Sequence, residues 1–96
     1  MRHPRHRYRL QLYITGATPR SREAVAAIRA ICEERLRGRY HLEIVDLREH
    51  QELASREQIT ALPLLVRRLP MPLRRLIGDL SNLDRVLHSL DLVPVP

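Results

Sequence analysis

The stretch from Leu69 to Asn82 constrains the fold of this chain most strongly, because its sequence, LPMPLRRLIGDLSN, places two prolines between apolar residues. Pro70 and Pro72 cannot continue a helix or a central strand, since proline lacks a backbone N–H and its φ is fixed. A compact apolar run precedes the prolines, and residues 73–77 can pair back across the turn that they form. The stretch therefore predicts a β-hairpin.

The clearest amphipathic pattern of the chain follows this hairpin. Ser81 or Asn82 can cap the free N–H groups at the start of a last helix. Its apolar residues recur at helical spacing and are Leu83, Val86, Leu87 and Leu90. The end of this segment also alternates as a strand does, with Leu90 and Leu92 between Ser89, Asp91 and Val93. Two packings can therefore compete there.

The first half of the chain predicts a strand, a helix and a second strand. Alternation begins at Tyr8, and its apolar face is formed by Leu10, Leu12 and Ile14, with Arg9, Gln11 and Tyr13 on the other face. Thr18 can cap a helix whose first turn contains Pro19 and which ends near Arg37. Alternation returns from Tyr40 to Ile44. We expect two parallel strands joined by a right-handed crossover.

The segment between the second strand and the hairpin has a weaker pattern. We interpret residues 48–61 as one short, poorly buried helix, in which Ser55 and Gln58 have the spacing of a capping box. Pro63 disfavours helical geometry at the residue before it, and the apolar run that begins at Leu64 predicts a third strand.

The resulting order, β-α-β-α-β-β-α, is the thioredoxin topology of α/β proteins, and 96 residues form one domain. A thioredoxin carries its Cys-x-x-Cys pair where the first strand meets the first helix, and here that place has the sequence GATP, residues 16–19. The only cysteine, Cys32, lies within the helix on the same face as Ile28, so we expect a buried structural thiol. Redox or peroxidase chemistry at Cys32 is the alternative function.

Charge and apolar content bound the other classes of function. All seventeen basic residues are arginine and the net charge is +6, with a basic arm at residues 1–7. This arm either solubilises the chain or contacts nucleic-acid phosphates; we favour the first, since interleaved aromatic residues are lacking. His3 and His6 alone make an incomplete set of metal ligands. No apolar run approaches the roughly 18 residues of a membrane span, so we expect a cytoplasmic protein. We also expect that the protein has no cofactor.

Four motifs resemble the KaiB family of small bacterial circadian-clock proteins, namely LYITG (12–16), IVD (44–46), ALP (61–63) and above all residues 69–82. The resemblance covers nearly the whole chain, residues 8–92, and is shared by the amino-terminal sensory domain of clock-associated histidine kinases. It implies a non-enzymatic regulator whose thioredoxin-like form binds a KaiC-like ring ATPase and modulates its phosphorylation or nucleotide cycle, in a circadian, timing or stress role. It also implies a second form, βαββααβ, that assembles as a tetramer, and thus a homo-oligomer, dimer or tetramer, in equilibrium with the monomer.

The resemblance divides the chain, a single KaiB-like domain over residues 1–96, into a βαβ half at 8–47 and a half of ambivalent fold at 48–93. Slow X-Pro isomerisation can supply a switch in the second half, or the prolines simply shape a turn. Relatives commonly have glycine in place of Ser89 and an aromatic residue in place of Pro94, and both departures favour the helical form. The residues assigned to the switch are Tyr8, Pro63, Pro70, Pro72, Ser89, Asp91 and Pro94.

The resemblance also points to partner contacts on the short second helix, where Glu52, Arg56 and Gln58 are the candidates. A polar helix face that only meets water is the alternative explanation for any one of them. A KaiA-like protein is a possible partner at the second strand, near His41 and Glu43, and a clock histidine kinase is a possible competitor for the ATPase.

Overall fold

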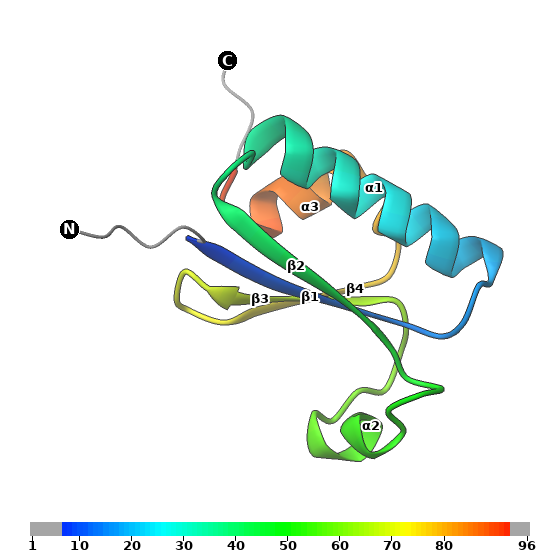
Figure 1. The fold of residues 1–96 in the computed structure, drawn as a ribbon. Coiled ribbons are helices and arrows are strands. Elements are labelled where there is room, and N and C mark those ends of the chain that lie inside the picture. Colours follow the sequence, from blue (N-terminus) through cyan, green and yellow to red (C-terminus); the bar gives the residue numbers. More distant parts are fainter. Residues whose placement is uncertain (1–6, 93–96) are drawn as a thin grey trace.

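The computed structural model describes residues 7–92, which form one α/β domain (Figure 1). The elements are β1 (Tyr8–Ile14), α1 (Pro19–Arg35), β2 (Tyr40–Asp46), α2 (Glu52–Arg56), β3 (Leu64–Leu69), β4 (Arg74–Ile77) and α3 (Leu83–Ser89). The sheet has the order β2-β1-β3-β4, with β2 parallel to β1 and the other two pairings antiparallel. The predicted order β-α-β-α-β-β-α and the parallel first pair are therefore confirmed.

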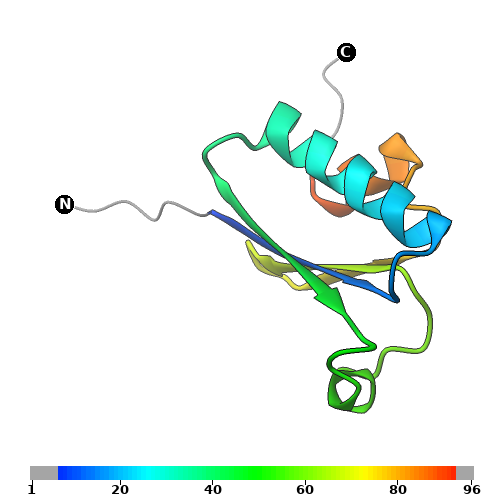
Figure 2. The same ribbon diagram turned by 45° about the vertical axis from the view of Figure 1, so that its right-hand side comes forward.

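The main core lies between one face of the sheet and helices α1 and α3, which cover that face together (Figures 1 and 2). Apart from Cys32, its buried members are aliphatic, since the chain has neither Phe nor Trp. They are Leu10, Leu12, Ile14, Ala24, Ile28, Ile31, Cys32, Leu36, Leu65, Leu80, Val86, Leu87 and Leu90. The predicted apolar faces of the first strand and of the helix that holds Cys32 are confirmed.

A smaller cluster lies on the opposite face, on the side of α2 (Figure 2). Its buried members are Tyr13, Val45, Leu47, Leu64 and Val66. Tyr13 lies on the face opposite the main core, as the alternation of its strand predicts. Its side chain is nevertheless buried, with 2% exposure. Half-buried Leu53 and Ala54 of α2 pack against this cluster, which agrees with the expected poor burial of that helix.

The helix starts follow the predicted capping chemistry. The Thr18 hydroxyl accepts a hydrogen bond from the Ser21 N–H at 3.1 Å, and Asn82 Oδ1 accepts one from the Arg85 N–H at 3.2 Å. Helix α1 ends at Arg35 rather than near Arg37, because Leu36 leaves the helical conformation and buries its side chain.

Two smaller predictions in the second half are wrong. Ser55 and Gln58 form no capping box, because α2 already begins at Glu52 and Gln58 lies beyond its end with a φ of 54°. Leu83 is 47% exposed and does not join its helical neighbours in the core.

The peptide bonds before the three prolines assigned to the switch, Pro63, Pro70 and Pro72, are cis. The basic arm with its two histidines, and Pro94 near the other end, lie outside the described residues. Within residues 7–92 no helix has the length and apolar character that a membrane span requires.

Candidate partner-binding site

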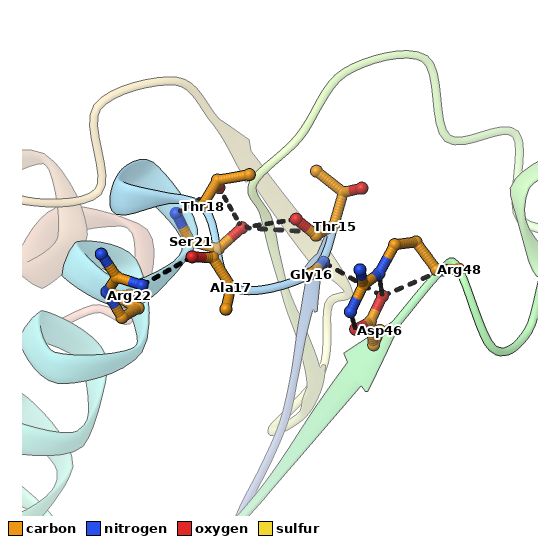
Figure 3. Close-up of polar contacts among 8 residues, drawn as sticks. All are labelled: Thr15, Gly16, Ala17, Thr18, Ser21, Arg22, Asp46 and Arg48. Atoms are coloured by element: carbon orange, nitrogen blue, oxygen red, sulfur yellow. Dashed lines mark hydrogen bonds and ion pairs between the residues drawn. The ribbon is translucent and has the colours of Figure 1, made fainter.

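The turn from β1 into α1 is the place where a thioredoxin carries its reactive thiols, and here it is closed by polar contacts (Figure 3). Ser21, buried at 3%, donates to the Thr15 carbonyl oxygen at 3.3 Å, and the Thr18 hydroxyl donates to Ser21 Oγ at 3.0 Å. None of the eight residues drawn in Figure 3 carries a thiol or an imidazole. These hydroxyl groups bond to one another and to the backbone, and they therefore shape the turn.

Asp46, the last residue of β2, holds this turn against the adjoining loop (Figure 3). Its Oδ1 accepts hydrogen bonds from the Gly16 N–H at 3.1 Å and the Arg48 N–H at 2.9 Å, and its Oδ2 pairs with Arg48 Nη2 at 3.1 Å. These bonds, above all those from the Arg48 side chain, lower the pKa of Asp46 to about 2. Asp46 is thus an ionised structural acceptor at neutral pH.

The thiol of Cys32 lies in the main core with no exposed surface. Burial, with a smaller contribution from the charge of Glu33, raises its pKa to about 12. Disulfide exchange needs an accessible thiolate of lowered pKa. The expected burial is confirmed, and the geometry opposes the alternative redox function at this residue.

Helix α2 is fixed to the sheet by two arginines from the neighbouring strands. Arg68 Nη2 of β3 pairs with Glu57 Oε1 at 2.8 Å, and this hydrogen bond lowers the pKa of Glu57. Arg75 of β4 donates to the carbonyl oxygens of Glu57 and Gln58, at 3.1 Å each. A five-residue helix without a buried side chain thereby has a defined position.

The exposed side of α2 carries the three residues proposed from the sequence. Glu52 and Arg56 lie one turn apart on the same side of the helix, and Gln58 follows just beyond its end. All three are exposed, and their side chains make no hydrogen bond or ion pair within residues 7–92. Glu52 and Arg56 therefore share one side of the helix, and Gln58 is exposed just after it.

The residues assigned to the switch fall into separate places, and several meet at the end of α3. Asp91, with a φ of 59°, accepts a hydrogen bond from Arg67 Nη1 at 2.7 Å, and the Pro72 carbonyl oxygen accepts one from Arg67 Nη2 at 2.9 Å. The Tyr8 hydroxyl lies 3.5 Å from the Leu90 carbonyl oxygen. Ser89 is half-buried beside them.

Arg67 and Arg68 are structural residues that the sequence pattern did not single out. Arg67 is 1% exposed, and its Nε has no hydrogen-bond partner in the part of the chain that the structure describes. The alternation of β3, continued beyond Val66, gives the face on which each arginine lies. Arg67 lies on the face of Leu65 and Arg68 on the face of Tyr13. The adjacent arginine pair was the available signal.

Metal binding gains no support from the described residues, since none of their His, Cys, Asp and Glu side chains gather in threes at one place. The structure offers instead a positioned helix with uncommitted polar side chains.

Comparison with known proteins agrees with this geometry. The KaiB domain model matches residues 11–92. The chain is 48% identical to the circadian clock protein KaiB3 of Synechocystis, over 88% of this chain and 83% of that protein. It is 46% identical to the circadian clock oscillator protein KaiB of Prochlorococcus marinus, over 94% of this chain and 76% of that protein.

Solved structures show the same fold. The N-terminal domain of SasA from Synechococcus elongatus superposes with a TM-score of 0.74 at 18% identity, over 100% of this chain and 94% of that one. The thioredoxin Deadhead of Drosophila melanogaster superposes with a TM-score of 0.67 at 15% identity, over 88% and 81%. The fold is thus thioredoxin-like, and the chain belongs to the KaiB family.

Proposed function

We propose that this chain is a non-enzymatic clock regulator that docks on a KaiC-like ring ATPase through α2 and modulates its phosphorylation or nucleotide cycle. The observation that carries the proposal is the state of α2, which two arginines hold in place while Glu52, Arg56 and Gln58 remain uncommitted. A positioned helix with free polar side chains loses little conformational entropy on binding. Membership of a clock-protein family supports the choice of partner.

The charges of α2 suggest how a partner is recognised. Glu52 and Arg56 carry opposite charges, so a complementary surface presents a basic group to one and an acidic group to the other. Reversing one exposed charge places like charges together, which slows association and weakens the complex.

Native mass spectrometry with the ring ATPase encoded in the same genome, in the presence of nucleotide, tests the proposal. We expect a complex with the unaltered chain and its loss or strong weakening with Arg56→Glu. Arg29→Glu is the matched control, since Arg29 is an exposed arginine of α1 and its reversal changes the net charge equally. No complex with the unaltered chain, or equal weakening by the two variants, contradicts docking through α2.

A second part of the proposal is that residues 48–93 also adopt the βαββααβ arrangement of a tetramer, with the thioredoxin-like monomer favoured. The hydrogen bonds from Arg67 to Asp91 and to the Pro72 carbonyl oxygen support this preference, because they connect the end of α3 to the hairpin. Ser89 supports it as well, since serine costs less in a helix than glycine does. Size-exclusion chromatography at micromolar protein is expected to give a monomer of 11.3 kDa, and a tetramer alone contradicts the preference.

Further clock partners belong to the same proposal. Among the described residues β2 forms one margin of the sheet, and Glu43 lies on it opposite Gln11 of β1. A partner strand can add at such a margin. This edge is the proposed contact for a KaiA-like protein. A clock histidine kinase with a sensory domain of the same fold is the proposed competitor for the ATPase.

A further inference from the structure

The margin of the sheet opposite β2 is formed by β4, and its surroundings are unlike the rest of the surface. All five large apolar side chains that are exposed among residues 7–92 come from the stretch that surrounds β4. They are Leu69, Met71, Leu73, Ile77 and Leu83, with exposed fractions from 39% to 72%. Of these, Leu73 directly precedes β4 and Ile77 ends it. Exposed apolar side chains beside an open strand edge are typical of an interaction surface.

Positive charge gathers in a groove of about 460 Å³ between β4 and α3. Three arginines, Arg74, Arg75 and Arg85, line it together with a single acidic residue, Asp84. Arg74 is exposed and makes no hydrogen bond or ion pair within the described chain. Its guanidinium is therefore available to a carboxylate, which it can bind through two parallel hydrogen bonds.

The backbone of β4 is available as well. One side of β4 pairs with β3, from Arg74 opposite Arg67 to Ile77 opposite Leu64. Outside this pairing, the only hydrogen bond from a described residue to a backbone group of β4 is the one from Arg85 Nη2 to the Ile77 carbonyl oxygen, at 3.1 Å. Alternate N–H and C=O groups of an edge strand point outward and accept a further strand.

We propose that the β4 edge binds an extended acidic segment of a partner protein, which pairs with β4 as a fifth strand. Carboxylates of the segment lie against Arg74 and Arg85, and its apolar side chains cover Leu73 and Ile77. This surface is distinct from the exposed side of α2, so binding here does not depend on the ring-ATPase proposal.

Two other occupants fit less well. A second copy of the chain would place another set of the same arginines along the seam, and like charges in paired strands are unfavourable. Nucleic acid would leave the apolar side chains uncovered, and none of the five is an aromatic ring on which a base could stack.

The test measures fluorescence anisotropy of a labelled peptide that alternates glutamate with valine, using the full chain. We expect binding that weakens about tenfold in Arg74→Glu and by less than about twofold in Arg29→Glu, the control with equal net charge. The same peptide with alternate amides N-methylated keeps its charges but cannot pair as a strand, so it should not bind. Amide NMR shifts should then locate the unmodified peptide at residues 74–77.

Several results overturn the proposal. Equal binding of the N-methylated peptide shows charge attraction alone, and equal weakening by Arg29→Glu shows an effect of net charge. Equal binding of a peptide that alternates lysine with valine removes the charge argument. Tighter binding of oligothymidylate at the same residues identifies a nucleic-acid surface, and dimerisation through this edge identifies a second copy. Arg74→Gln, which preserves size and polarity, provides the smaller change if Arg74→Glu disturbs the amide spectrum as a whole.

Discussion

Replacing Arg68 by methionine should lower the free energy of unfolding by about 2 kcal/mol, because Arg68 joins β1, β3 and α2. Its Nε donates to Gln11 Oε1 at 2.6 Å, and its Nη2 contacts Glu57 Oε1 at 2.8 Å and the Tyr13 hydroxyl at 3.3 Å. Methionine retains much of the apolar stem and removes all three polar contacts.

The magnitude follows from the exposure and length of each contact. The short bond to Gln11 is worth about 1 to 1.5 kcal/mol net, and the longer one to Tyr13 about 0.5. The ion pair with Glu57 is about a third exposed on both sides, so solvent screening limits it to about 0.5 to 1 kcal/mol. These contributions add to roughly 2 to 3 kcal/mol. Methionine costs less free energy than a guanidinium to remove from water, which offsets about a few tenths of a kcal/mol.

Urea unfolding followed by circular dichroism measures this loss. With a slope of about 1 kcal/mol per molar urea for a chain of this size, the midpoint should fall by about 2 M at unchanged slope. Arg75→Met is the matched control, because Arg75 is exposed and bonds only to carbonyl oxygens of Glu57 and Gln58. It should cost less than about 1 kcal/mol.

The pH dependence gives a second readout of the same contact. Because the pKa of Glu57 is lowered from 4.5 in the folded state, its ionisation stabilises the fold fully above pH 4.5. That contribution is lost as the pH falls through the lower folded pKa. The difference between the unaltered chain and Arg68→Met should therefore shrink in acid. A loss below about 0.5 kcal/mol at neutral pH, or equal losses in Arg68→Met and Arg75→Met, would refute the reasoning.

Three further predictions concern the turn after β1 and the core. Gly16→Ala should cost about 1 to 2 kcal/mol or more, because φ is +64° and the new Cβ would lie 2.6 Å from Arg48 Cζ. Gly38→Ala, at φ +77° with open space, should cost less in the same urea titration. Asp46→Asn should weaken the fall of thermal stability in acid. The ionised Asp46 stabilises the fold fully above pH 3.8, and this contribution is lost as the pH falls through its folded pKa of about 2. An unchanged dependence of thermal stability on acid pH contradicts this. Cys32 should react with a thiol reagent only at the rate of unfolding, whereas rapid labelling of the folded chain would show an accessible thiol.

Local chemistry made much of the fold predictable from the sequence. Thr18 and Asn82 predicted the starts of α1 and α3, because a side-chain oxygen at a helix start accepts hydrogen bonds from backbone N–H groups whatever the rest of the chain does. The alternation of β1 was equally local, since one face of a half-buried strand must be apolar. The exposure of the three residues proposed as partner contacts was also predictable, because polar positions of a weakly amphipathic helix are visible in the pattern.

Long-range contacts explain what the sequence analysis missed. Ser55 and Gln58 match a capping box by spacing, but the position of α2 is set by arginines that are distant in the sequence. Continued alternation of β3 places Arg67 on the core face, but the sequence pattern does not point to its partner Asp91, which lies 24 positions away. Tyr13 is buried in the cluster on the α2 side of the sheet. The alternation of β1 gives the face of Tyr13 but not the residues that cover it.

The pairing of the sheet has a consequence for any large rearrangement of this chain. Within the sheet, the second half joins the first only through the register of β1 with β3, from Arg9 opposite Leu69 to Tyr13 opposite Leu64. Separating the halves therefore requires breaking this one ladder and removing the packing of α3 and of the Tyr13 cluster, while the β1-α1-β2 unit keeps its own hydrogen bonds. Substitutions along the β1–β3 ladder therefore act on the connection between the two halves.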